Sequence, residues 1–337
     1  MAARSQAAVR LGQVSPHAAL VHEIVAGLTA RPKRISPKYF YDEAGARLFD
    51  AITQTPEYYL TRCEVAILRE RSIEIARHIP DGAAMVEFGS GSSTKARILI
   101  AAAPAIAAYV PVDISAKILL REAEELRRDR PGLAVLPVET DFSQAFALPA
   151  EIAALRRVGF FPGSTLGNFE PHEACAFLRH AARILGDGAT LIIGVDLVKD
   201  ANTLDAAYND AAGITAKFNL NLLDRINREL NASFDPASFS HYAFYNAEQH
   251  RIEMHLVSKK RQKVKVGGRS IEFRSGETIH TENSYKYTLD SFTALARGSG
   301  WTPLAAWTDA DGKFSVHVLV FGAAEEAVPP RADLHSV

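Results

Sequence analysis

Cysteine and long apolar runs are scarce in this chain. Only Cys63 and Cys175 occur among the 337 residues, and they lie far apart, so we expect two unpaired packing residues rather than a disulfide framework. No apolar run approaches the ~20 residues that a membrane-spanning helix needs. Residues 1–6 contain no apolar segment that leads to a cleavage site. These features predict a cytoplasmic location and no membrane partner.

An excess of charge of either sign is also absent. The 38 basic and 39 acidic residues give a net charge of −1, without a long basic run. This balance disfavours nucleic acid as a partner and favours a small-molecule substrate. The eleven histidines show no His-Glu-x-x-His spacing and no cysteine partner, so no metal site is expected. We expect a monomer.

A short apolar strand followed by a two-glycine turn stands at residues 86–95. Gly89 and Gly91 would let the backbone approach a ligand, and the N–H groups of the following helix would face the same place. The third glycine of the dinucleotide fingerprint and the Gly-Lys-Ser/Thr of a Walker loop are both missing. Asp113 ends the next apolar strand, at the spacing expected for an acidic residue on a ribose. S-adenosylmethionine, a sulfonium nucleoside, therefore fits better than a nicotinamide cofactor.

The chain from Met85 to Asp196 alternates short apolar strands with amphipathic helical segments. Near-continuous apolar strands separated by helices predict an α/β fold, in which a mostly parallel sheet is covered by helices on both faces. The expected strands are 85–88, 109–113, 133–137, 158–161 and 190–196. Ligands bind beyond the carboxyl ends of such strands, where Gly89, Asp113 and Asp141 lie.

A different pattern follows Asp196. One helical stretch, 204–230, precedes a strand at 251–257 with period-two alternation, which predicts a half-buried antiparallel sheet. Gly267-Gly268 is typical of a hairpin tip. We expect a helix at 290–298 with Asp290 as its N-cap, and two closing antiparallel strands at 303–307 and 314–321.

These patterns divide the chain. We expect residues 15–197 and 288–323 to form the main domain and residues 198–287 to form an inserted, smaller α+β domain. Residues 1–14 and 324–337 are expected to be flexible ends.

Several polar or aromatic clusters permit two interpretations each. Tyr41, Tyr58 and Tyr208 are either core aromatics or ligand contacts. Asn168, just past a central strand in a glycine-containing loop, either caps the next helix or holds the amine and carboxylate of an amino acid. Along residues 280–286, alternation places His280, Glu282, Ser284 and Lys286 on one strand face, which is either solvated or lines a polar cavity.

Taken in order, these clusters resemble the family of S-adenosylmethionine-dependent L-histidine Nα-methyltransferases of ergothioneine biosynthesis. The likeness runs over nearly the whole chain. The motifs that carry it are Phe40-Tyr41-Asp42, Pro56-Glu57-Tyr58-Tyr59, Glu87-Phe88-Gly89-Ser90-Gly91, the loop from Gly163 to Asn168, Asp196 to Asp200, Tyr208 with Asp210 to Gly213, Arg251 to Met254, and Thr281-Glu282 with Ser284.

The resemblance implies roles for individual residues. The fold would be that of a Rossmann-like class I methyltransferase with an inserted substrate-binding domain. Tyr41, Tyr58 and Asn168 would take part in catalysis near the α-amino group. The residues implied to bind substrate are Tyr58, Asn168, Tyr208, Met254, Glu282 and Ser284, and those implied to bind the cofactor are Gly89, Lys95, Asp113, Asp141 and Phe142.

The implied activity is stepwise transfer of methyl groups to the α-amino nitrogen of L-histidine, giving trimethylhistidine (hercynine). A water chain through Tyr41 or Tyr58 could carry the amine proton away. The alternatives are an Nα-methyltransferase for another amino acid, a nicotinamide-dependent oxidoreductase, a nucleic-acid methyltransferase, and a cofactor-binding regulator without catalysis.

Overall fold

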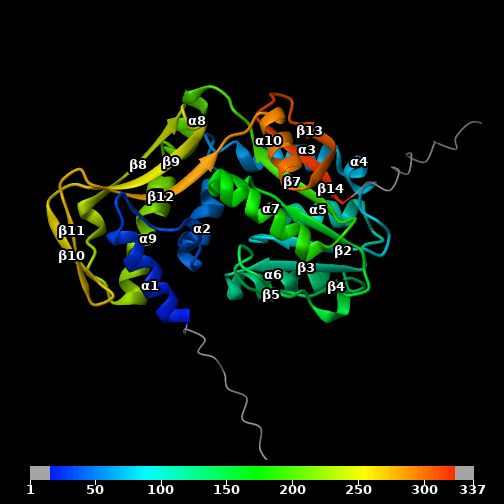
Figure 1. The fold of residues 1–337 in the computed structure, drawn as a ribbon, viewed down its shortest axis with the longest axis horizontal. Coiled ribbons are helices and arrows are strands. Elements are labelled where there is room, and N and C mark those ends of the chain that lie inside the picture. The colour runs from blue at the N-terminus through cyan, green and yellow to red at the C-terminus, as the bar shows by residue number, and fades with distance from the viewer. Residues whose placement is uncertain (1–15, 323–337) are drawn as a thin grey trace, which may run out of the picture.

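The computed structural model describes residues 16–322, whose helices and strands gather around two main sheets (Figure 1). The predicted flexible ends, 1–14 and 324–337, lie outside the described residues. Among the described helices, none combines the length and the apolarity needed to cross a membrane.

The larger sheet has eight strands in the order β13-β14-β7-β6-β2-β3-β4, with β5 beside β3. The strands from β7 to β4 run parallel, as predicted, whereas β14 is antiparallel to β7 and β13 to β14. Its strands are β2 (Ala84–Phe88), β3 (Ala108–Asp113), β4 (Ala134–Val135), β5 (Val138–Glu139), β6 (Arg157–Phe161), β7 (Thr190–Asp196), β13 (Trp301–Thr308) and β14 (Phe314–Phe321).

Helices cover both faces of this sheet because the strand residues that point to either face are apolar. Met85 and Tyr109 belong to a core shared with α3, α5 and α6, whereas Val86 and Val110 belong to a core shared with α7 and α10. The helices are α3 (Leu60–Glu70), α4 (Ser72–Ala76), α5 (Thr94–Ala102), α6 (Ala116–Asp129), α7 (Pro171–Leu185) and α10 (Leu289–Gly298), and short 3-10 turns occur at η2 (Ala150–Ile152) and η3 (Thr165–Asn168).

The second sheet has four strands in the order β1-β12-β9-β8. Its edge strand β1 comes from the N-terminal part of the chain and pairs in parallel with β12, Lys33 lying opposite Ile279. The elements of this part are α1 (Pro16–Thr29), β1 (Lys33–Arg34), η1 (Pro37–Phe40), α2 (Glu43–Ile52), α8 (Ala201–Tyr208), α9 (Ile214–Leu230), η4 (Pro236–Ser238), β8 (Phe239–Asn246), β9 (Arg251–Ser258) and β12 (Thr278–Tyr285), with the hairpin β10 (Gln262–Val266) and β11 (Arg269–Phe273) beside them.

Three local predictions need correction. The stretch 204–230 is two helices, because Gly213 takes a left-handed φ of 66° and the Asp210 carboxylate accepts from the N–H groups of Ile214 and Thr215 at the start of α9. The N-cap of α10 is Thr288 rather than Asp290, since the Thr288 hydroxyl accepts from Ser291 N–H in a capping box. The predicted hairpin at Gly267-Gly268 is confirmed.

The third correction concerns the polar face of β12. A bulge at Thr281 shifts the register, so His280 lies opposite His255 whereas Glu282 lies opposite Met254. Because residues 254 and 255 point to opposite faces of the sheet, His280 and Glu282 do as well. The prediction that they share a face is wrong, since alternation cannot reveal an inserted residue.

Candidate active site

The turn after β2 and the end of β3 are joined by hydrogen bonds. Gly89 has a φ of 71°, and its N–H donates to Val112 O at 2.8 Å. The Asp113 carboxylate accepts from Gly91 N–H at 3.2 Å and from Ser115 N–H at 2.8 Å. A Cβ at position 89 would lie 3.2 Å from the Phe142 ring. The carboxyl ends of the parallel strands thus bring together Gly89, Asp113 and Phe142, a set that fits a nucleoside with its diol and its flat base.

The other two predicted cofactor residues lie around this turn. Asp141 accepts from Ser143 N–H at 3.0 Å and lies 3.5 Å from Lys38 Nζ. Lys95 Nζ forms an ion pair with Glu64 at 2.5 Å, and both oxygens of Glu64 accept from Gly163 N–H at 2.9 Å. The structure therefore places Lys95 between α3 and the loop after β6.

The sequence motifs assign no role to Glu64, although the spacing of apolar residues in its helix indicates that it is buried. Leu60, Glu64, Ile67 and Leu68 are the buried residues of α3 and follow helical spacing. A glutamate on such an apolar stripe needs a partner inside the protein, which here is Lys95 and the Gly163 N–H.

Five aromatic rings from separated segments form a continuous cluster. Tyr58 contacts Tyr208 edge-on at a centroid distance of 6.3 Å and Phe49 at 6.1 Å. Tyr41 contacts Phe49 at 5.7 Å and Phe218 at 5.9 Å. Burial, followed by the nearby charge of Glu282, raises the pKa of the Tyr41 phenol above its ordinary value. Burial likewise raises the pKa of Tyr58, so both phenols stay protonated at neutral pH.

Glu282 and Ser284 lie on one face of β12, at the side of the aromatic cluster. The Glu282 carboxylate has no hydrogen-bond partner within residues 16–322. Burial raises its pKa to about 7, against the opposing effect of Lys286. Ser284 Oγ accepts from the Tyr208 hydroxyl at 2.8 Å. Met254, directly opposite Glu282 on β9, is only 1% exposed.

Asn168 ends the turn η3. The N-cap of α7 is Glu170, so the capping role that the sequence left open for Asn168 is not adopted. Its side-chain amide has no hydrogen-bond partner among the described residues. The turn begins at Ser164, whose φ of 58° is left-handed and whose Oγ accepts from Asp196 N–H at 2.9 Å. Asn168 is thus a partly exposed amide on a turn fixed to the end of β7.

Asp196 is fully buried and contacts several of these segments. Its carboxylate accepts from the Tyr59 hydroxyl at 2.8 Å and pairs with Lys199 and Lys286, each at 2.7 Å. Burial lowers the pKa of Lys199 to about 8. These contacts join the end of β7 in the larger sheet to Tyr59 and to Lys286, the residue that follows β12. Local sequence patterns could not reveal them, because the partners are far apart in the chain.

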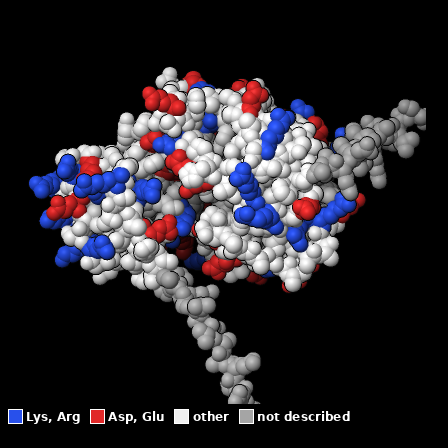
Figure 2. Space-filling view, in the orientation of Figure 1, with Lys and Arg blue, Asp and Glu red and all other residues white. Residues whose placement is uncertain are grey.

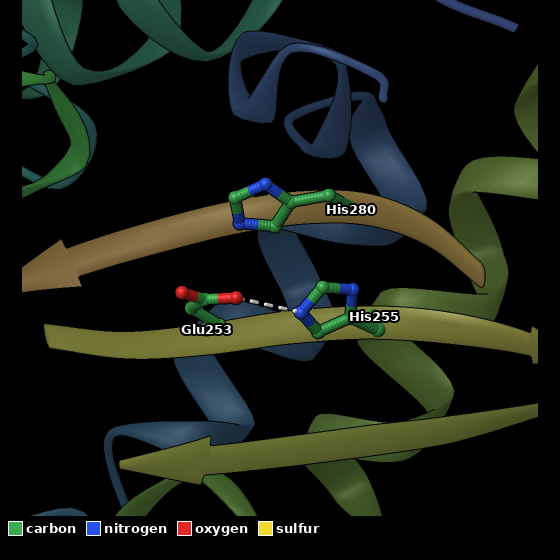
Figure 3. A group of neighbouring side chains, drawn as sticks. All are labelled: Glu253, His255 and His280. Atoms are coloured by element: carbon green, nitrogen blue, oxygen red, sulfur yellow. Dashed lines mark hydrogen bonds and ion pairs between the residues drawn. The ribbon is translucent and has the colours of Figure 1, made fainter. Parts of the chain in front are cut away.

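A second polar cluster lies on the opposite face of the smaller sheet (Figure 3). The ligand atoms of Glu253, His255 and His280 lie within 4.8 Å of one another. The two imidazole rings are stacked, with an interplanar angle of 18°, which does not direct their nitrogens to one point. Glu253 already accepts from Arg251 at 2.8 Å and from His255 at 3.0 Å. Arg251 and His255 already occupy the two carboxylate oxygens of Glu253, so we assign no metal here.

The surface around the two sheets carries mixed charge. Figure 2 shows basic and acidic side chains interspersed over the visible face, and that face is hollowed between the part with the smaller sheet and the part with the larger one. Basic side chains gather on the β10–β11 hairpin, where Lys263 pairs with Glu272 at 2.7 Å.

The strand order, the antiparallel β14 and the glycine turn facing Asp113 define a Rossmann-like class I methyltransferase. Residues 20–321 match the family described as histidine-specific, S-adenosylmethionine-dependent methyltransferases. The chain belongs to that family, and S-adenosylmethionine is its methyl donor.

Relatives of known name agree with this membership. The chain is 40% identical over 319 residues to a histidine N-alpha-methyltransferase of Mycobacterium tuberculosis (strain CDC 1551 / Oshkosh), covering 93% of this chain and 98% of the relative. A protein of the same name from Mycolicibacterium smegmatis is 40% identical over 307 residues, covering 90% and 95%. Ergothioneine biosynthesis protein 1 of Neurospora crassa is 28% identical over 86% of this chain and 33% of its own length.

Proposed function

We propose that this enzyme transfers methyl groups from S-adenosylmethionine to the α-amino nitrogen of L-histidine, in succession to trimethylhistidine (hercynine), as the first step of ergothioneine biosynthesis. The observation that carries the proposal is the Glu282 carboxylate, unpaired and partly buried beside an aromatic cluster. The names of its mycobacterial and fungal relatives support the same substrate and pathway.

The proposal assigns the predicted residues to two groups. Gly89, Lys95, Asp113, Asp141 and Phe142 would hold the cofactor, and Lys95 also pairs with Glu64 beside the loop at Gly163. Asn168, Tyr58 and Tyr208 would hold the amino and carboxylate groups of histidine, while Glu282, Ser284 and Met254 surround its ring. The division at residues 198–287, a monomeric enzyme in the cytoplasm and a reaction without metal belong to the same proposal.

The chemistry follows from positioning. The bound cofactor supplies an electrophilic methyl group on sulfur. An amine attacks such a group in line and only as a neutral lone pair, so the site must hold the nitrogen at ~3–3.5 Å and release its proton. Tyr41 and Tyr58 remain protonated, which lets them pass a proton along a hydrogen-bonded chain but not act as phenolate bases.

The aromatic cluster also accounts for repeated methylation. Each transfer makes the amine larger and more apolar, and the final product is a quaternary ammonium that cannot donate a hydrogen bond. Aromatic faces attract such cations by roughly 0.5–2 kcal/mol. Tyr41, Phe49 and Tyr58 therefore suit the product as well as the substrate.

The test is to incubate the protein with S-adenosylmethionine and each of the twenty amino acids in turn, and to follow product masses. We expect gains of one, two and three methyl groups on histidine alone. Methylation of another amino acid instead of histidine would overturn the substrate assignment. Cofactor binding without any methylated product would favour a non-catalytic regulator.

A further inference from the structure

Lys286 is a fully buried lysine between the two sheets, with 0% of its side chain exposed. Its Nζ lies 2.7 Å from Asp196 Oδ2, 2.7 Å from Ser284 Oγ and 3.2 Å from the Tyr208 hydroxyl. An ammonium group has three donors, and these contacts use all of them. Burial lowers the pKa of Lys286, but the charges of and hydrogen bonds to Asp196 and Tyr208 together outweigh burial and hold the pKa above its ordinary value. Lys286 is therefore a cation at neutral pH.

The contacts of Lys286 determine which hydrogen bonds Ser284 can still make. A hydroxyl oxygen has two acceptor positions and one O–H donor. Lys286 fills one acceptor position of Ser284 Oγ at 2.7 Å, and the Tyr208 hydroxyl fills the other at 2.8 Å. Only the O–H of Ser284 remains, and the cation beside it polarises the hydroxyl and strengthens it as a donor.

Glu282, two residues earlier on the same face of β12, provides a hydrogen-bond acceptor beside the donor of Ser284. When ionised, its carboxylate only accepts hydrogen bonds, and when protonated its carbonyl oxygen still accepts one. The ionisable groups around Glu282 and Ser284 are Lys286 with its partner Asp196 and the protonated phenols of Tyr41, Tyr58 and Tyr208. One acceptor and one donor side by side match a neutral imidazole, which has one N–H and one bare nitrogen. They do not match an imidazolium, which has two N–H groups.

We infer that Lys286 is a positioning residue that holds Ser284 as a hydrogen-bond donor, so that the site selects the neutral form of an azole ring bearing one N–H and one unprotonated nitrogen. The inference rests on the proposed function, since it takes the histidine ring to lie against Glu282 and Ser284. It adds the protonation state of the substrate and a residue, Lys286, that does not itself touch the ring.

The test uses the whole protein with S-adenosylhomocysteine and L-histidine labelled with 15N in the ring, observed by NMR between pH 5.5 and 8. We expect the bound ring to show one protonated and one unprotonated nitrogen at pH values where free histidine is mostly imidazolium. A bound ring with two protonated nitrogens at pH 6 would overturn the inference and leave the proposed function intact. Failure of histidine to bind would instead count against the proposed function.

Two lysine variants separate the role of Lys286 from general electrostatics. Lys286→Met should ease protonation of the bound ring, raising its protonation constant about tenfold, the effect of roughly one hydrogen bond. Lys199→Met is the matched control, because Lys199 also pairs with Asp196 at 2.7 Å but contacts neither Ser284 nor Tyr208. We expect it to leave the ring protonation unchanged.

Folding of each variant is checked by its melting curve and its affinity for S-adenosylhomocysteine. If Lys286→Met does not fold, Ser284→Ala removes the donor directly and should raise the protonation constant in the same direction. An unchanged constant in a folded Lys286→Met or Ser284→Ala protein would overturn the inference. An equal rise in Lys199→Met would assign the effect to charge alone and overturn it too.

Discussion

Two glutamates of the smaller sheet have opposite environments although they lie close in the fold. Glu282 has no hydrogen-bond partner among the described residues, and burial raises its pKa to about 7. Burial also acts on Glu253, but hydrogen bonds from Arg251, Asn246 and His255 outweigh it and lower the pKa to about 2. An ionised Glu282 therefore opposes folding, whereas an ionised Glu253 supports it.

This contrast predicts opposite stability changes. Between pH 4.5 and 7 the unfolded chain ionises Glu282 while the folded protein does not, so the destabilisation grows with pH and is complete above about 7. Glu282→Gln should thus stabilise the ligand-free protein at pH 8 by about 1–3 kcal/mol and leave it unchanged at pH 4.5. Denaturant unfolding at both pH values measures this difference.

Glu253→Gln is the matched control, with the reverse sign. The stability from Glu253 is present above pH 4.5 and is lost as pH falls towards 2, so this variant should be less stable at pH 8. If both variants lose stability at pH 8, the buried carboxylate of Glu282 has a partner in solution and our account of its raised pKa is wrong.

At the residue scale, the sequence indicated which side chains could act but not which contacts they make. Position at strand ends or on a polar strand face identified Asp113, Asn168, Glu282 and Ser284 as candidates. The family resemblance then implied their roles. The Lys286–Asp196 ion pair escaped prediction because the two residues are 90 positions apart and meet only when the two sheets pack together.

At the scale of elements, apolar runs and their spacing predicted the parallel sheet and its covering helices well. Their limits appear where one residue changes the geometry. The bulge at Thr281 reverses the side on which His280 lies, and the turn before α9 divides a stretch that is helical in pattern. Each depends on backbone angles or tertiary hydrogen bonds that hydrophobic periodicity does not encode.

The glycine turn after β2 gives a prediction at this scale. Gly89→Ala would place a Cβ 3.2 Å from the Phe142 ring, in addition to the strain of a left-handed φ of 71°. Gly91→Ala is the matched control, since its φ is 43° but its Cβ would meet nothing within 4 Å. The left-handed strain is of order 1–2 kcal/mol in both.

We expect Gly89→Ala to bind S-adenosylhomocysteine at least ~10-fold more weakly than Gly91→Ala, because only the first displaces Phe142. Titration calorimetry measures both affinities. Equal losses in the two variants would show that the turn conformation matters and that the ring of Phe142 does not.

At the scale of the whole molecule, the N-terminal residues connect the two sheets. β1 extends the smaller sheet beside β12, while the Asp42 carboxylate accepts from Asn221 of α9 at 2.9 Å and from Arg228 at 2.5 Å. The backbone carbonyl of Tyr41 accepts from the Ser115 hydroxyl at 2.8 Å. Ser115 lies two residues after Asp113, the last residue of β3 in the larger sheet. The segment that carries Tyr41 is thus fixed to the cofactor strand and to the smaller sheet together.

This connection predicts that the two ligands bind cooperatively. Bound cofactor would order the loop at Asp113 and Ser115, and through the Ser115–Tyr41 hydrogen bond it would order one wall of the histidine site. A site already ordered costs less free energy to occupy, so histidine should bind more tightly when S-adenosylhomocysteine is present.

Ser115→Ala tests the connection directly. It removes the hydroxyl bonded to Tyr41 O but keeps the Ser115 N–H that donates to Asp113, and this hydroxyl makes no cap bond in α6. We expect the ratio of histidine affinities with and without S-adenosylhomocysteine to fall about 3–10-fold, the effect of one hydrogen bond. Ser143→Ala is the control, because its hydroxyl bonds to Asp141 at 2.5 Å but does not contact Tyr41. Calorimetric titrations of the three proteins give the ratios. A wild-type ratio in Ser115→Ala would show that the Ser115–Tyr41 hydrogen bond does not couple the two sites.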